Sequence, residues 1–68
     1  MKLKELRLKS GIKAQKIADE LGISRVQLYN LEKGIYKLDK LKEEKLSLIY
    51  KVPLKTIKNA QKEGKKNE

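Results

Sequence analysis

The stretch AQKIADELGISRVQLYNLEK, residues 14–33, decides the fold. An α-helix turns by about 100° per residue, so the apolar residues in the first part of this stretch share one side of a helix over residues 14–21. They are Ala14, Ile17, Ala18 and Leu21. Gly22 then fits a turn that needs a positive φ angle, which residues with a Cβ adopt only at a cost. The pattern predicts two short helices joined by a tight turn.

The second helix of the pair is expected over residues 24–33, where Ser24 is a suitable N-cap. Leu28 and Leu31 point inward on this helix, and Glu32 lies at the margin of the buried side. The outward face carries Arg25, Val26, Tyr29, Asn30 and Lys33. The periodicity therefore predicts that these side chains form one solvent-exposed ridge beyond the turn.

Glycine and proline divide the rest of the chain into further segments of helical length. We expect five short helices in all, over residues 2–10, 14–21, 24–33, 40–50 and 54–63. Asp39 is the expected N-cap of the fourth. Together the helices would form a compact all-α bundle and one domain over residues 1–63. Residues 64–68 contain no apolar side chain and are expected to form a disordered basic tail.

The composition favours a polyanionic partner. Eighteen Lys and Arg residues against nine Asp and Glu give the 68-residue chain a formal charge of +9. Such a charge favours nucleic acid or an anionic membrane surface, unless the lysines only keep the protein in solution. Because the chain has no Cys and no His, we expect no disulfide, no metal site and no cofactor.

Neither a membrane span nor an enzyme is expected. The longest apolar run, residues 48–50, has three residues, which is too short for a bilayer span or a signal peptide. We therefore expect a cytoplasmic protein with no membrane partner. The adjacent carboxylates at residues 19–20 and 43–44 diverge by about 100° on a helix, so they do not converge on a substrate. No glycine-rich phosphate loop or nucleophile–base pair can be assembled.

Residues 14–33 resemble the helix-turn-helix of the Cro/C1-type regulators, the xenobiotic-response-element family. The resemblance rests on four residues at characteristic spacings: Ala18, Gly22, Leu28 and Leu31. The segment LRLKSGI, residues 6–12, resembles the first helix of that family, and the similarity covers residues 3–57. The resemblance implies a λ-repressor-like fold and a transcriptional regulator, a repressor, that binds double-stranded DNA sequence-specifically.

The resemblance also implies roles for individual residues. The helix over residues 24–33 would lie in the major groove. Base edges would be read by Ser24, Arg25, Val26, Tyr29 and Asn30. Arg25 suits guanine and Asn30 suits adenine. Phosphates would be contacted by Lys13, Gln15, Lys16, Lys33, Tyr36 and Lys37. Arg7 and Glu32 would form an internal salt bridge that ties the first helix to the end of the third.

Four positions differ from the residues that the family usually has. Lys13 and Ala14 stand where the family usually has Thr-Gln, so the phosphate contact of that Gln is lost or supplied by Lys13 or Gln15. Leu38 replaces the usual proline after the third helix, which leaves the loop before Asp39 less determined. Lys51 replaces the glycine of a usual Gly-Val pair.

The fourth helix has two apolar stripes, and both cannot fully face so small a core. One stripe is Leu41, Leu48, Ile49 and Val52, with Lys45 in its middle, and the other is Leu46 and Tyr50. Either the helix is buried on two sides or one stripe meets another molecule. We hypothesise a homodimer contact through Leu46, Tyr50, Leu54 and Ile57. Such a dimer would bind a palindromic operator. We also expect that a chain of this length has no room for a separate domain that binds a small-molecule ligand.

Three other functions remain open at this point. The same fold could serve as a protein-interaction module, with Val26 and Tyr29 as anchors. The charge alone could drive sequence-indifferent binding of nucleic acid. A basic amphipathic element on a membrane is a weaker alternative, because glycine interrupts the chain about every ten residues.

Overall fold

The computed structural model describes the backbone of residues 2–66 and the side chains of residues 2–62. Over this range the chain forms five α-helices and no strand. They are α1 (Leu3–Ser10), α2 (Ala14–Leu21), α3 (Arg25–Glu32), α4 (Lys40–Tyr50) and α5 (Leu54–Lys66). The all-α fold class predicted from the sequence is confirmed, and the predicted bounds of the first four helices agree to within a residue at either end.

Part of the expected tail belongs to α5. Residues 64–66 continue α5, so the prediction that this segment is disordered is wrong for them. A helix that has begun gains one hydrogen bond for each further residue that it fixes, so it can continue past its last apolar contact. Residues 67 and 68, which were also assigned to the tail, lie outside the described residues.

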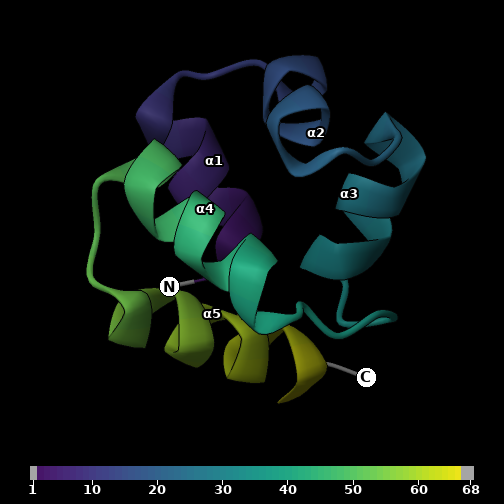
Figure 1. The fold of residues 1–68 in the computed structure, drawn as a ribbon. Coiled ribbons are helices and arrows are strands. Elements are labelled where there is room, and N and C mark those ends of the chain that lie inside the picture. Colours follow the sequence, from purple (N-terminus) through teal and green to yellow (C-terminus); the bar gives the residue numbers. More distant parts are fainter. Residues whose placement is uncertain (1, 67–68) are drawn as a thin grey trace.

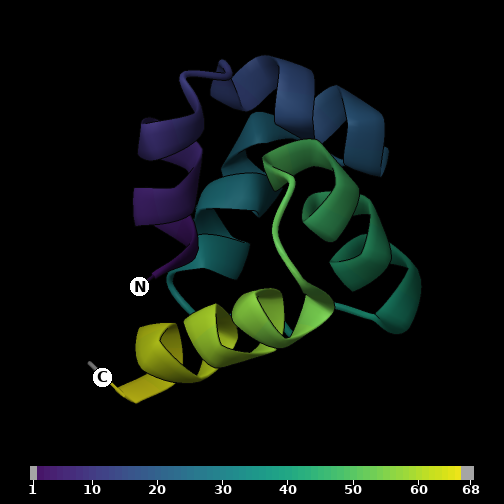
Figure 2. The same cartoon turned by 90° about the vertical axis from the view of Figure 1, so that its left-hand side faces the viewer.

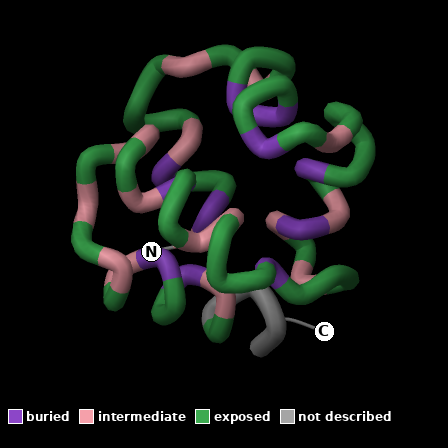
Figure 3. The backbone as a smooth tube through the Cα atoms, in the orientation of Figure 1, coloured by how far each residue is buried: buried purple, intermediate pink, exposed green. Residues whose placement is uncertain are grey.

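The helices surround one core. α2 and α3 form one side of the molecule, and α1 and α4 form the other (Figure 1). α5 lies across the base and packs against α1 and α4 (Figure 2). Figure 3 marks the buried stretches of the backbone in purple. The buried residues form one hydrophobic cluster, and they are Leu3, Leu6, Ile17, Ala18, Leu21, Leu28, Leu31, Leu38, Leu46, Ile57 and Ala60. This core fixes α3 so that its opposite face points outward.

The two apolar stripes of α4 differ in burial, and this difference corrects the predicted dimer contact. Leu46 is 2% exposed and Ile57 is fully buried, so neither side chain can reach a second molecule. Tyr50 and Leu54, the other two residues of that prediction, are half-buried. By contrast Leu41 and Leu48 are exposed. The sequence pattern shows which residues are apolar, but the packing of α1, α2 and α5 onto α4 decides which of them are covered.

The ends of the helices carry local signals that match their backbone conformations. Gly22 ends α2 with a φ angle of 72°, as the turn prediction required. Asp39 caps α4 through a hydrogen bond from the Lys42 N–H to its carboxylate, at 2.8 Å. Lys51 ends α4 with a φ angle of 56°, a left-handed conformation that is unfavourable for a residue with a Cβ.

Leu38 explains how the loop between α3 and α4 is held without a proline. Its side chain is buried in the core, and its N–H donates to Gln61 Oε1 at 3.3 Å. Gln61 Nε2 in turn donates to Glu43 Oε2 at 2.6 Å. A proline at position 38 would have no N–H to donate. The substitution therefore ties this loop to α4 and α5.

Within the described part of the chain, none of the helices combines the length and the apolar character needed to cross a bilayer.

Candidate nucleic-acid interface

The outward face of α3 presents the ridge that the periodicity predicts. Arg25, Val26, Tyr29 and Lys33 are exposed, whereas Asn30 is half-buried. Leu28 and Leu31 lie on the opposite side of the helix and are buried. Burying those two leucines orients the whole ridge, because residues on one helix keep a fixed angular relation.

A capping box fixes the start of α3. Ser24 Oγ accepts a hydrogen bond from the Gln27 N–H at 3.1 Å, and the Ser24 N–H donates to Gln27 Oε1 at 2.9 Å. Two backbone N–H groups at the helix start are thereby satisfied. The Ser24 hydroxyl keeps its own proton for a further acceptor. The role of Gln27 was not predicted from the sequence, although the Ser-x-x-Gln spacing is the known signal of such a box.

An ion pair joins α1 to the end of α3. Arg7 Nε lies 2.7 Å from Glu32 Oε2, and a second guanidinium nitrogen lies 3.1 Å from Oε1. The two side chains are 12% and 6% exposed. The hydrogen bond to Glu32 raises the pKa of Arg7, which stays charged. Two parallel hydrogen bonds to one carboxylate hold both groups in a fixed plane.

Two tyrosines flank this pair. The Arg7 guanidinium carbon lies 5.6 Å from the centre of the Tyr29 ring, within the range of a cation–π contact. Tyr50 of α4 lies on the buried side, where burial and then the negative charge of Glu32 raise the pKa of its phenol. Tyr50 therefore stays neutral at ordinary pH. Helical periodicity predicts Tyr29 only as an outward-facing residue and does not indicate its contact with α1.

The start of α2 differs from the starts of α3 and α4. Ser24 and Asp39 cap α3 and α4, but Lys13 makes no side-chain cap and the first turn of α2 has no acidic residue. The first backbone N–H groups of α2 therefore have no side-chain acceptor from this cap. Lys13 and Lys16 are exposed beside them. This end of α2 offers N–H groups and positive charge to an anion.

Gln15, the third residue predicted for phosphate contact near this helix start, is also exposed. Its amide Nε2 donates to Asp19 Oδ1 at 2.9 Å. An amide nitrogen carries two protons, so one remains for another acceptor.

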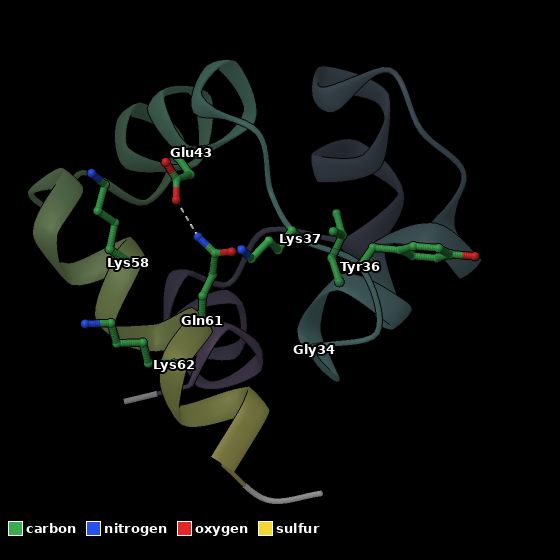
Figure 4. A pocket seen from close by; sticks show the side chains of 8 residues that line it. Gly34, Tyr36, Lys37, Glu43, Lys58, Gln61 and Lys62 are labelled. Carbon is green, nitrogen blue, oxygen red and sulfur yellow. Dashed lines mark hydrogen bonds between the residues drawn. The ribbon is translucent and has the colours of Figure 1, made fainter.

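Tyr36 and Lys37, predicted from the loop after α3, point in different directions (Figure 4). A groove of about 360 Å³ lies between this loop and α5. Both residues line the groove, but the Tyr36 ring extends away from Gln61, whereas Lys37 reaches toward Gln61 (Figure 4). The polar ends of these two side chains therefore lie apart.

The exposed cations of α3 have no acidic partner among the side chains that the structure describes. The ion pairs within that range are Arg7–Glu32 and Lys42–Asp39. Among the described side chains, Arg25 and Lys33 thus have no carboxylate that occupies their donors. Over the same residues, no group of carboxylates is arranged to hold a metal ion. The chemistry available at the ridge is hydrogen-bond donation and attraction of anions.

Comparison with known proteins agrees with this geometry. A helix-turn-helix family model, that of the Cro/C1-type or xenobiotic-response-element regulators, matches residues 3–57, which is most of the chain. No curated protein and no solved structure matches the chain closely enough to add to this finding. The matched range includes the ridge, the ion pair, all of α1 to α4 and the first turn of α5. The chain therefore belongs to the Cro/C1-type family of helix-turn-helix DNA-binding regulators.

Proposed function

We propose that this protein is a sequence-specific repressor that reads the major groove of duplex DNA with the exposed face of α3. The single observation that carries the proposal is the ridge of exposed polar side chains on a helix whose other face is buried. A B-DNA major groove is about 12 Å wide and admits one α-helix. Repression follows from occupancy alone when such a site overlaps a promoter.

Base readout falls to the residues at the start and on the outer face of α3. Arg25 is exposed and has no carboxylate partner among the described side chains, so its guanidinium is free for two hydrogen bonds to guanine. Asn30 is half-buried and suits adenine if its amide reaches the groove. Val26 is 66% exposed and would meet a thymine methyl group. Tyr29 and the Ser24 hydroxyl complete the proposed readout set.

Phosphate contacts would set the position of the helix without specifying sequence. The uncapped start of α2, with Lys13 and Lys16, provides donors on one side of α3. Lys33 provides a cation at the other end of α3. Gln15 and Tyr36 are secondary candidates, and Lys37 would first have to leave the groove beside Gln61 (Figure 4).

We further propose that two copies bind an inverted repeat and come together on the DNA. Each copy carries a formal charge of +9, so free copies repel one another and phosphates relieve that repulsion. In a symmetric pair the two α3 helices would enter the major groove about 34 Å apart, one turn of the duplex.

Selection of bound sequences from random duplexes at moderate salt tests the proposal. We expect enrichment of an inverted repeat whose half-sites are centred about one helical turn apart. Sedimentation of the protein with the selected duplex should then give two copies for each duplex. Binding without enrichment would instead indicate sequence-indifferent association with nucleic acid. No binding at all would favour a protein partner for the α3 face.

A further inference from the structure

Arg7 contacts two side chains of α3 that lie one helical turn apart. Its guanidinium donates two hydrogen bonds to Glu32, at 2.7 and 3.1 Å. The same guanidinium lies 5.6 Å from the centre of the Tyr29 ring. Residues three apart are neighbours on one side of a helix, so one planar group can contact both. A side chain of α1 thus contacts a residue of the exposed ridge on α3.

The two contacts differ in what the fold requires of them. Glu32 is 6% exposed, so its charge needs the Arg7 partner whatever the function of the protein. Tyr29 is 38% exposed and is not part of the core, so the bundle has no comparable need of its ring. The Arg7–Tyr29 contact therefore has consequences mainly for the exposed surface.

The guanidinium is a firm support for that ring. Arg7 is 12% exposed and is held in plane by both oxygens of one carboxylate. Attraction between the cation and the ring face restricts the positions open to the tyrosine. Val26, on the same outward face, is 66% exposed against 38% for Tyr29. Tyr29 is thus covered by the protein more than Val26 is, while part of its surface stays available to a ligand.

We propose that Arg7 is a positioning residue for DNA recognition, because it holds the Tyr29 ring in its binding orientation before DNA arrives. This inference rests on the proposed function, in which Tyr29 faces base edges. Ordering a free side chain at an interface costs affinity, and a side chain that is already ordered avoids that loss. By this argument, discrimination at the base pair that Tyr29 meets depends on α1.

The first experiment measures the ring in the DNA-free protein. Three-bond couplings that report the Tyr29 side-chain rotamer should indicate one dominant rotamer in the wild-type protein. In Arg7→Lys, which keeps the positive charge but loses the planar group, the couplings should average over rotamers. Lys9→Gln, an exposed change on the same helix, should leave them unchanged. An unchanged Tyr29 rotamer in a folded Arg7→Lys protein would overturn the inference.

The second experiment is a double-mutant cycle on DNA. Discrimination is measured as the ratio of affinities for the selected site and for the same site with one base pair changed. Arg7→Lys should reduce the ratio by up to about tenfold at one base pair in the Tyr29 protein and leave it unchanged in Tyr29→Ala. If Arg7→Lys does not fold, Glu32→Gln replaces it, because the amide keeps the shape but weakens the hold on Arg7. Equal effects with and without Tyr29 would assign Arg7 a purely structural role.

The two readouts separate failure of this inference from failure of the proposed function. Suppose that Arg7→Lys loses the fixed Tyr29 rotamer but that the wild-type protein does not discriminate between duplexes. This pair of results would uphold the positioning of the ring by Arg7 but remove its role in DNA recognition. Discrimination that depends on Tyr29 but not on Arg7 would keep the proposed function and overturn the inference.

Discussion

Helices α3 and α4 both have a buried and an exposed face, but their exposed faces differ. On α3, side chains of the outward face contact neighbouring groups, through the Ser24–Gln27 box and the contact of Arg7 with Tyr29. On α4, Leu48 is 78% exposed and Leu41 is 61% exposed, and apolar residues of this kind are common on protein surfaces. Exposed apolar area does not distinguish the two faces, because Val26 on α3 is 66% exposed as well, whereas the contacts made by the outward face of α3 do distinguish them.

The largest effect expected from this comparison concerns two glutamates. Glu32→Ala removes the partner of a nearly buried guanidinium and should lower the free energy of unfolding by about 3–5 kcal/mol. Glu44→Ala on the exposed face of α4 should change it by less than about 0.5 kcal/mol. Denaturant unfolding measures both. Similar values for the two variants would show that the ion pair does not anchor α3.

A second pair of variants tests the two faces of α4. Leu46→Ala should destabilise the protein by about 2–5 kcal/mol because it opens a cavity in the core. Leu48→Ala should have an effect within about 0.5 kcal/mol. Thermal unfolding followed by circular dichroism distinguishes the two. A large loss from Leu48→Ala would mean that its stripe is covered by another molecule in solution.

The third comparison is between residues that read bases and residues that supply charge. Arg25→Ala should lower affinity for the selected duplex by about 1–3 kcal/mol and relax the preference at one base pair. Lys33→Ala should weaken binding to all duplexes alike and reduce the slope of log affinity against log salt by about 1. Lys55→Ala on α5 is the control for the loss of one positive charge away from α3. Identical behaviour of the Arg25 and Lys33 variants would refute the division between readout and positioning.

A smaller effect is expected where α2 and α4 end. Both helices end in a left-handed residue, but α2 uses Gly22 and α4 uses Lys51. Lys51→Gly should raise the free energy of unfolding by about 0.5–1 kcal/mol, because glycine adopts this conformation without steric cost. Gly22→Ala should lower it. Since a Cβ at Gly22 would meet no atom within 4 Å, that loss would come from the backbone angle alone. Destabilisation by Lys51→Gly would contradict this explanation.

The smallest effect concerns the cap of α4. The hydrogen bond from the Lys42 backbone lowers the pKa of Asp39 below its ordinary value of 3.8. A depressed pKa stabilises the fold above the ordinary value, and this contribution disappears as the pH falls through the folded-state pKa. Asp39→Asn keeps a cap without the charge. The difference in melting temperature between wild type and variant should therefore shrink in acid. A difference that grows below the pKa would contradict this assignment.

The sequence predicted α2 and α3 well because each has a single apolar stripe, so the exposed residues follow from periodicity. It failed at Leu46 and Ile57 of the predicted dimer contact because α4 has two stripes, and only the packing of the neighbouring helices onto α4 decides that Leu46 is covered and Leu48 is not. The contact between Arg7 and Tyr29 could not be predicted either. These residues lie far apart along the chain, and only tertiary packing brings them together.

The most direct test is a titration of isotopically labelled protein with the selected duplex, followed by backbone amide and side-chain shifts. The proposed function predicts the largest changes at Arg25, Tyr29 and Lys33 and at the start of α2, with little change on the outer face of α4. Perturbations concentrated at Leu41 and Leu48, with α3 unaffected, would contradict it.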